Sequence, residues 1–197
     1  MPNKVYQFKV SLKGIKTSIW RRIQVPETYT FWDLHVAIQD SMGWTDSHLH
    51  QFEILNPQCG TPEFIGNSEY EYDEDVVVLS EEIIGISSYF SLHNKSAIYV
   101  YDYGDNWIHH VVLEEILPQK PGLKYPICID GERACPPEDC GGCWGYEELV
   151  EVMKNPKHER YAELRDWLGK KYKPEEFKSE KVVFDDPEKR FEESGYF

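Results

Sequence analysis

The sequence has no long apolar run and comparatively few basic residues. No stretch approaches the roughly 18 to 20 consecutive apolar residues that a membrane-spanning helix needs. The first residues, MPNKVYQFKV, alternate polar and apolar side chains and lack the apolar segment of a signal peptide. We therefore expect a soluble, cytoplasmic protein. Its 21 Lys and Arg against 35 Asp and Glu give a formal net charge of -14, which disfavours generic binding to nucleic acid.

One short segment departs from this charge balance. Trp20, Arg21 and Arg22 lie together in "IWRRIQV". Two adjacent arginines beside an aromatic ring give a hypothesis of local DNA binding. The alternative is that the arginines form one face of a strand at the edge of a sheet.

The chain also lacks internal repeats and low-complexity linkers. Its 197 residues suffice for one well-filled domain, so we expect a single domain over residues 1–197. The last segment, KPEEFKSEKVVFDDPEKRFEESGYF, is charged and weakly periodic. We expect residues 171–197 to wrap the surface of a core that spans about residues 4–170.

Period-two alternation of apolar residues predicts two long hairpins. "KVYQFKVSLKG" and "TSIWRRIQVPE" form the first, and "SAIYVYDY" and "WIHHVVLEE" form the second, around Gly104, Asp105 and Asn106. Two further segments, "HLHQFEIL" and "DVVVLS", are predicted strands. Strands dominate the first two-thirds of the chain.

Helix signals are concentrated in one early segment and in the last third. Thr30 and Asp33 form a capping-box pattern before "FWDLHVAIQDSMG", and Gly43 suits the C-terminal cap. A short helix is predicted in "EEIIGISSYF". A C-terminal helical pair is predicted to end at Asn155 and at Gly169. The pattern indicates an α+β fold with an antiparallel or mixed sheet.

Four of the five cysteines lie in one short stretch, "CIDGERACPPEDCGGCWGY". Thiolates of Cys128, Cys135, Cys140 and Cys143 would complete a tetrahedral structural zinc site, with Cys140 and Cys143 as a CxxC knuckle. Two alternatives remain: reduced thiols in a packed loop, and a disulfide or redox pair. The redox alternative draws on the position of Cys143 before a predicted helix, whose dipole would lower the thiol pKa.

Histidine and aspartate form a second group of candidates. His48 and His50 point the same way if their segment is extended, and the second hairpin supplies Asp102, Asp105 and His109. With a two-residue turn at Gly104 and Asp105, Asp102 would pair with Trp107 and lie diagonally across from His109. His50, Asp102, Asp105 and His109 are therefore candidate catalytic residues of a metal-dependent hydrolase. Alternatively, the aspartates bond their own turn and the histidines are structural.

Large aromatic residues are unusually frequent in the chain, and three tyrosines lie in the second hairpin. Tyr99, Tyr101 and Tyr103 share one face of a strand. Core packing explains such a face best, although it would also suit a partner surface or the stacking of bases.

Four ordered motifs resemble the plasmid pRiA4b ORF-three-like family. They are "IWRRIQVPETYTFWDLHVAIQDSMGW", "HLHQFEI", "YDYGDNWIHHV" and "CIDGERACPPEDCGGCWGYEEL". The resemblance implies a single α+β domain and an association with plasmids and transposon passenger genes, but no established reaction. Some members are labelled resolvase-like, yet the arginines here are scattered among carboxylates, which does not suit a recombinase centre. The family pattern often has proline at the position of Cys143, so a four-thiolate site would belong to this branch.

From these observations we expect a non-enzymatic module that binds a macromolecule in a mobile-element context and is stabilised by zinc at the cysteines. A protein partner is favoured over nucleic acid, and no membrane partner is expected. The alternatives are a metal-dependent hydrolase and local DNA binding through Arg21 and Arg22.

Overall fold

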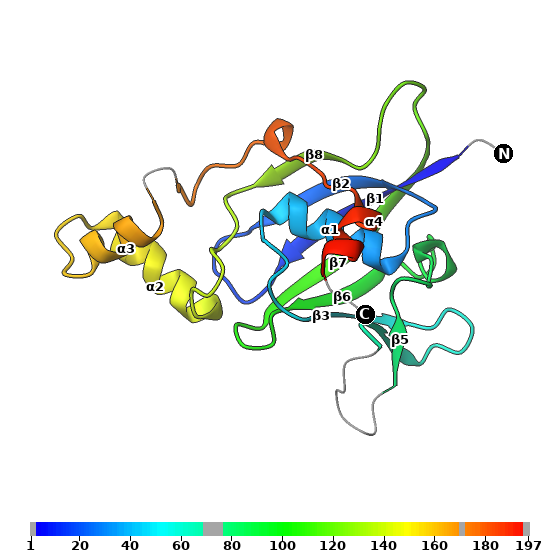
Figure 1. Cartoon of the computed structure of the whole chain (residues 1–197), viewed down its shortest axis with the longest axis horizontal. Helices are drawn as coiled ribbons and strands as arrows, with labels where there is room; N and C mark the ends of the chain where they lie inside the picture. The colour runs from blue at the N-terminus through cyan, green and yellow to red at the C-terminus, as the bar shows by residue number, and fades with distance from the viewer. Residues whose placement is uncertain (1–2, 69–76, 170–171, 195–197) are drawn as a thin grey trace.

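A mixed sheet of eight strands organises the protein (Figure 1). The computed structural model describes residues 3–68, 77–169 and 172–194. In spatial order the strands are β5 (Val78–Ser80), β4 (Pro62–Gly66), β3 (His50–Leu55), β6 (Ser96–Tyr101), β7 (Trp107–Pro118), β1 (Lys4–Leu12), β2 (Trp20–Pro26) and β8 (Ile127–Glu132). Neighbouring strands are antiparallel except β4 and β5, which are parallel. The predicted α+β class with an antiparallel or mixed sheet is confirmed.

The two predicted hairpins form the middle of the sheet. β1 pairs with β2, β6 pairs with β7, and β1 also pairs with β7, so the hairpins lie side by side. Alternation along β1 explains the arrangement, because Phe8, Val10 and Leu12 are buried while Lys9 and Ser11 are partly exposed. One face of the sheet therefore carries the core.

The early helix, α1 (Phe31–Met42), lies across this apolar face (Figure 1). Its capping box forms as predicted: Asp33 N donates to Thr30 Oγ1 at 3.2 Å, and Thr30 N donates to Asp33 Oδ2 at 2.9 Å. Gly43 ends the helix in the left-handed region at φ 95°, where glycine is favoured. Leu34 and Ile38 are fully buried against the sheet, which fixes the helix in place.

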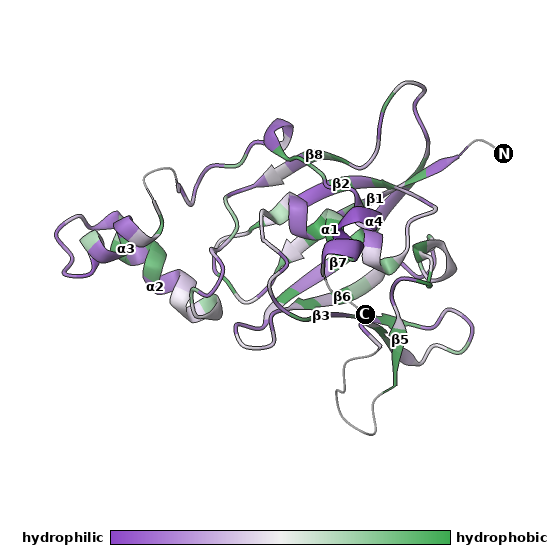
Figure 2. Cartoon of the chain, in the orientation of Figure 1, coloured by the Kyte–Doolittle hydropathy of each residue, from purple (hydrophilic) through white to green (hydrophobic). Residues whose placement is uncertain are grey.

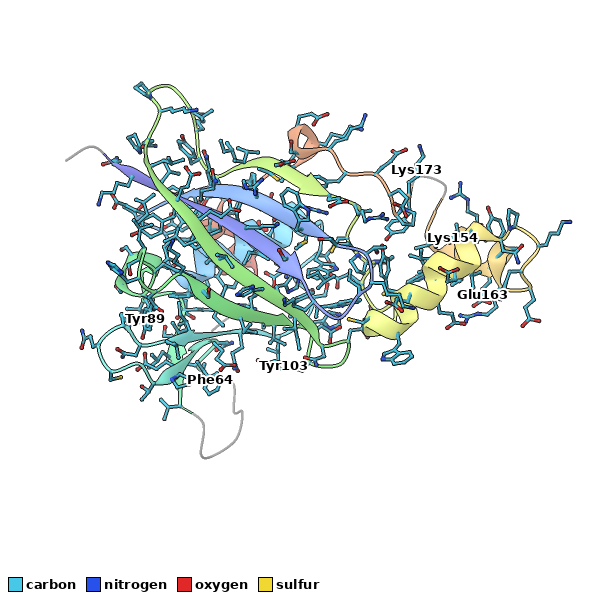
Figure 3. All side chains as sticks on the ribbon, turned by 180° about the vertical axis from the view of Figure 1, so that it is seen from behind. Phe64, Tyr89, Tyr103, Lys154, Glu163 and Lys173 are labelled. Carbon is cyan, nitrogen blue, oxygen red and sulfur yellow. The ribbon has the colours of Figure 1, made fainter. Side chains whose placement is uncertain are left out.

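The predicted C-terminal pair forms α2 (Gly142–Lys154) and α3 (Tyr161–Trp167). Both project beyond the end of the sheet, and we call them the helical arm (Figure 1). In Figure 3, Lys154 and Glu163 lie on the arm at a distance from the strands, and Lys173 lies where the chain returns to the sheet. Figure 2 shows that the turn between the two helices is hydrophilic.

Several elements differ from the expectation. The segment predicted as a short helix forms the 3-10 turn η1 (Ile86–Ser88), and residues 69–76, which include the start of the predicted strand "DVVVLS", lie outside the described residues. The charged tail forms the 3-10 turn η2 (Ser179–Lys181) and the helix α4 (Pro187–Ser194). α4 is mostly hydrophilic (Figure 2), so its periodicity gave little signal. Within the described residues, the helices are too short or too polar to cross a membrane.

Tertiary contacts hold the tail against α1. Trp32 Nε1 donates to the carbonyl oxygen of Pro187 at 2.9 Å. Arg190 Nη2 lies 2.6 Å from Asp40 Oδ1 and also forms an ion pair with Asp185. The position of α4 therefore depends on partners that are far away in the sequence.

Candidate functional site

The turn of the second hairpin is longer than predicted. Tyr101 pairs with Trp107, so residues 102–106 form the loop and Asp102 does not pair with Trp107. Asp102 and Asn106 adopt positive φ angles of 57° and 55°, and Asn106 N donates to Asp102 O at 2.6 Å. The predicted diagonal contact of Asp102 with His109 is therefore wrong, because a two-residue turn was assumed.

The candidate residues His50, Asp102, Asp105 and His109 lie in separate surroundings. His50 is buried at the start of β3, and its Nε2 lies 2.6 Å from Glu81 Oε2. His109 is fully buried, with Nδ1 3.3 Å from the carbonyl oxygen of Tyr99. Asp105 Oδ2 accepts a hydrogen bond from Gly141 N at 3.1 Å. The structure does not bring the four together as one cluster.

Asp102 instead lies beside His48. His48 Nε2 is 3.7 Å from Asp102 Oδ2 and 3.2 Å from Asp139 Oδ1, and the three ligand atoms lie within 4.8 Å of one another. We call these residues the His48 cluster. They come from the segment before β3, from the β6–β7 turn and from the cysteine-rich loop. Three of the four segments that carry the family resemblance therefore meet here.

The geometry of the His48 cluster suits a bound cation. Nε2 of His48 is shielded from solvent and makes no hydrogen bond with the described residues, despite the two nearby carboxylates. Ligand atoms that share an ion at about 2.1 Å lie about 3 to 3.5 Å apart. The distances from His48 to Asp139 and Asp102 lie close to that spacing, so little movement would complete a three-ligand set.

The same loops are fixed by hydrogen bonds around the His48 cluster. Asp102 Oδ1 accepts from Gly104 N at 2.8 Å, which leaves Oδ2 directed to His48. Glu138 Oε1 accepts from Thr45 N at 2.9 Å and from Tyr101 Oη at 3.0 Å. The rings of Tyr101 and His48 form a T-shaped pair, with centroids 5.8 Å apart and planes at 70°. These contacts hold the segment before β3 and the cysteine-rich loop against the turn.

Exposure differs among the three residues. The side chain of Asp102 is 9% exposed, that of His48 is 28% exposed and that of Asp139 is 75% exposed. A cation held here would have protein on one side and solvent on the other. Such a site leaves coordination positions for water or substrate.

A cleft of about 380 Å³ opens next to Asp139. It lies between α2 and α3, and its apolar lining residues include Leu149, Leu164 and Trp167. Arg160 also lines the cleft and pairs with Glu148 at 2.6 Å. Asp139 of the His48 cluster therefore lies at the edge of a cavity that can accommodate a small molecule.

A second group consists of His35 on α1 with Asp46 and His50, and its two histidines are buried. His35 Nε2 lies 2.8 Å from Asp46 Oδ1, and His35 Nδ1 lies 2.8 Å from Tyr99 Oη. Burial, followed by the charge of His50, lowers the pKa of His35, which favours the neutral ring. In that form Nε2 donates to Asp46 and Nδ1 accepts from Tyr99. Since both nitrogens of His35 have partners, we interpret this group as a structural network.

The candidate zinc ligands Cys128, Cys135, Cys140 and Cys143 are free thiols. No three of their sulfur atoms lie within 4.8 Å of one another, so a four-thiolate site is not assembled in the described structure. Cys128 Sγ lies 3.5 Å from Asp130 O, and Cys143 Sγ lies 3.4 Å from Lys13 O. The structural zinc site at these cysteines stays a prediction.

The pKa values of these thiols are raised. Burial raises the pKa of Cys140 to about 12, and it also raises the pKa of Cys143, which lies in the first turn of α2. A reactive thiol requires a lowered pKa, which is the opposite shift.

The tight start of α2 depends on Gly145, where an added Cβ would lie 1.9 Å from the carbonyl oxygen of Cys140.

Arg21 and Arg22 have different surroundings. Arg21 is 1% exposed, whereas Arg22 Nε lies 2.6 Å from Glu114 Oε2 and Nη1 lies 3.1 Å from Asp130 Oδ2. The two side chains do not form the exposed basic patch that local DNA binding requires.

Of the three tyrosines on one strand face, Tyr99 and Tyr101 are core residues, and Tyr103 is 42% exposed in the turn.

The fold and the site together define a one-domain α+β protein with an open His-Asp-Asp cluster beside the turn of its central hairpin. This chain belongs to the plasmid pRiA4b ORF-3-like protein family, whose model matches residues 4–181. The family expected from the four sequence motifs is thus confirmed.

Two relatives extend this result. The chain is similar to the uncharacterised protein y4hQ of Sinorhizobium fredii, with 35% identity over 169 residues that cover 86% of this chain and 83% of the relative. It is also similar to the crystal structure of MM3350, a protein of unknown function from Methanosarcina mazei Go1. That similarity has a TM-score of 0.86 and 52% identity, and it covers 93% of this chain and 100% of the other.

Proposed function

We propose that the protein is a metal-dependent hydrolase whose divalent ion is bound by His48, Asp102 and Asp139. The observation that carries the proposal is the position of His48 Nε2, which lies 3.2 Å and 3.7 Å from two carboxylate oxygens without hydrogen-bonding to either. One imidazole and two carboxylates form a ligand set for a first-row divalent ion such as Zn²⁺.

The exposure of the site supports a catalytic ion over a structural one. Three protein ligands leave a coordination position open, and a bound ion would lower the pKa of water there towards neutrality. The neighbouring residues have supporting roles. The hydrogen bond from Gly104 N to Asp102 Oδ1 orients the carboxylate, so that Oδ2 faces His48. The hydrogen bond from Tyr101 to Glu138 fixes the loop that carries Asp139. Leu149, Leu164 and Trp167 would contact the apolar part of a substrate in the adjacent cleft.

Asp139 and Cys140 are neighbours in the sequence, so variants of the two residues distinguish the proposed metal site from the thiolate site. Protein prepared without chelator and then dialysed against Zn²⁺ should hold about one ion per chain by elemental analysis. His48→Ala and Asp139→Asn should each lose most of that metal, while the matched control Cys140→Ser should retain it. Loss in Cys140→Ser with retention in Asp139→Asn would favour the thiolate site and overturn this assignment.

Hydrolysis requires a separate readout. Chromogenic esters, phosphoesters and amides should be tested with the metal-loaded wild type and with Asp139→Asn. We expect turnover of one class by the wild type and at least a tenfold loss in the variant, because removal of a ligand weakens metal binding. Stoichiometric metal without turnover of any class would reject the hydrolase while keeping the metal site.

A second candidate function is a protein-binding module, as the sequence first indicated. The specific observation is Trp144, which is 89% exposed on α2 beside Ile15. Large exposed aromatic residues are typical of protein interfaces. Quantitative affinity capture should compare the wild type with Trp144→Arg and with Trp167→Arg, which changes another exposed tryptophan of the arm. A partner that depends on Trp144 alone would support this function, and equal capture by all three proteins would reject it.

A further inference from the structure

In the part of the chain that the structure describes, Arg21 is a buried cation without a carboxylate partner. Its Nε donates to Ser41 O at 2.7 Å, and Nη1 donates to Trp20 O at 2.9 Å and to Glu132 O at 3.1 Å. Within the described residues Nη2 makes no hydrogen bond and no acidic oxygen lies within the 4.0 Å of an ion pair. Arginine stays charged in proteins, and a buried charge is normally compensated by an opposite one.

Other arginines of the chain show how unusual this is. Arg22, Arg133, Arg160 and Arg190 each pair with at least one carboxylate. Acidic residues outnumber basic ones by 35 to 21, so partners are abundant. Arg21 is more deeply buried than these arginines. Among the described residues, however, only backbone carbonyl oxygens accept hydrogen bonds from its side chain.

Arg21 lies at the base of a cleft of about 530 Å³. The cleft is bounded by the end of α1, by residues 134–138 of the cysteine-rich loop and by residues 172–183 of the tail. Phe177 covers the guanidinium, with its ring centroid 3.7 Å from Cζ of Arg21. Pro136, Pro137 and Val182 add apolar surface to the lining.

Two further cations line this cleft. Lys178 and Lys181 are exposed, and neither has an ion pair within 4.0 Å among the described residues. Two carboxylates of the lining are paired with cations, Asp40 with Arg190 and Glu176 with Lys173 at 2.6 Å. The third, Glu138, accepts hydrogen bonds from Thr45 and Tyr101 and has no ion pair among the described residues. The lining therefore carries three cations without an ion pair among the described residues, Arg21, Lys178 and Lys181, against one such carboxylate, beside apolar surface in a strongly acidic protein.

We propose that this cleft binds a small organic anion, a carboxylate or phosphate group carried on an apolar body. The anionic group lies near Nη2 of Arg21 and between Lys178 and Lys181, where charge-assisted hydrogen bonds are strongest. The apolar body contacts Phe177, Pro137 and Val182. This site does not use the His48 cluster, so it holds whether or not the protein is a hydrolase.

Binding can be measured with four probes: acetate, benzoate, inorganic phosphate and phenyl phosphate. Calorimetric titrations at constant ionic strength should show saturable binding of benzoate or phenyl phosphate, and at least tenfold weaker binding of the matching probe without a ring. The comparison of benzoate with phenyl phosphate identifies the anionic group. The proposal would be overturned if no probe bound saturably up to about 10 mM. A dissociation constant above that concentration corresponds to a binding free energy too small for a built site.

Variants locate the binding site. The double variant Lys178→Ala/Lys181→Ala should weaken the bound probe at least tenfold, while Lys154→Ala/Lys189→Ala, with the same change in charge, should bind normally. Equal weakening in both pairs would indicate a long-range charge effect and contradict the site. The variant Arg21→Lys tests the role of the guanidinium in binding. It is used if its circular dichroism and melting temperature match those of the wild type.

Chemical protection covers the case in which Arg21→Lys does not fold. In the wild-type protein, saturating probe should slow acetylation of Lys178 and Lys181 at least threefold, measured by peptide mass spectrometry, and should leave Lys189 unaffected. Equal acetylation rates with and without probe would overturn the assignment of the anion to this cleft.

Discussion

The imidazole rings of His35 and His50 lie face to face, with centroids 3.4 Å apart and planes within 8° of parallel. Each ring has its own carboxylate, Asp46 for His35 and Glu81 for His50. The stack connects α1 to β3 below the surface. Its stability depends on hydrogen bonds that compensate buried polar atoms.

Replacement of His50 by leucine should strongly destabilise the protein. Glu81 is fully buried, and its Oε1 already has no hydrogen-bond partner among the described residues. Without His50, Oε2 also loses its donor, and loss of one member of a buried pair costs about 3 to 5 kcal/mol. Urea denaturation at pH 7 measures the change. The double variant His50→Leu/Glu81→Leu should recover part of the loss, and a single variant as stable as the wild type would contradict this network.

His109 should make the protein less stable in acid. Burial lowers its pKa from 6.5 to about 4, in surroundings formed by Trp44, Tyr99 and Trp107. Between these two values the unfolded chain binds a proton that the folded chain does not, so stability falls as the pH decreases through this window. The loss from pH 7 to pH 5 is about 2 kcal/mol from this residue.

The variant His109→Leu should therefore show a flatter dependence of unfolding free energy on pH between 7 and 5. At pH 7 it should lie within about 1 kcal/mol of the wild type, because the hydrogen bond to Tyr99 is long and Nε2 has no partner among the described residues. Urea denaturation at both pH values gives the comparison, with His110→Leu on the opposite face of β7 as the control. An unchanged pH slope would refute the prediction.

Cysteine labelling should separate Cys59 from the cysteine-rich loop. Cys59 is exposed, and a hydrogen bond from the hydroxyl of Thr61, 2.9 Å from its sulfur, lowers its pKa. Cys135 is buried, and burial raises its pKa. Because the thiolate is the reactive species, iodoacetamide should label Cys59 first and Cys135 last in a time course followed by mass spectrometry. Similar rates at both sites would mean that the loop opens in solution.

Gly131 should not tolerate alanine. An added Cβ would lie 2.4 Å from Cε1 of Phe177 and 2.8 Å from the carbonyl oxygen of Trp20. Overpacking of this kind typically costs about 1 to 3 kcal/mol, and it should also weaken the docking of the tail. The melting temperature should fall for Gly131→Ala and recover partly in Gly131→Ala/Phe177→Ala, since the backbone contact with Trp20 remains.

Gly85→Ala is the matched control for this prediction. An added Cβ there meets no heavy atom closer than 3.8 Å, so its melting temperature should stay near that of the wild type. An equal fall in Gly131→Ala and Gly85→Ala would show that lost backbone freedom, and not the contact with Phe177, is responsible.

The sequence pattern made His50 a candidate, whereas in the structure it is His48 that lies near Asp102 and Asp139. Alternation places both histidines on one face of an extended segment, but β3 begins only at His50. His50 consequently enters the core, while His48 stays in the preceding loop and faces Asp102. Alternation identifies a strand well and its first residue poorly. Asp139 lies between Pro137 and Cys140 in the sequence, and no local pattern there marks it as one of the proposed ligands.

The sequence by itself determined what short-range physics controls. Alternation defined the two hairpins, and the capping box of Thr30 and Asp33 with Gly43 defined α1, because those interactions join residues a few positions apart. Only the tertiary structure decided that His48, Asp102 and Asp139 meet, that no three sulfur atoms of the four cysteines lie within 4.8 Å of one another, and that Arg21 is buried under Phe177. These contacts depend on the paths of loops and the packing of distant elements, which local periodicity does not encode.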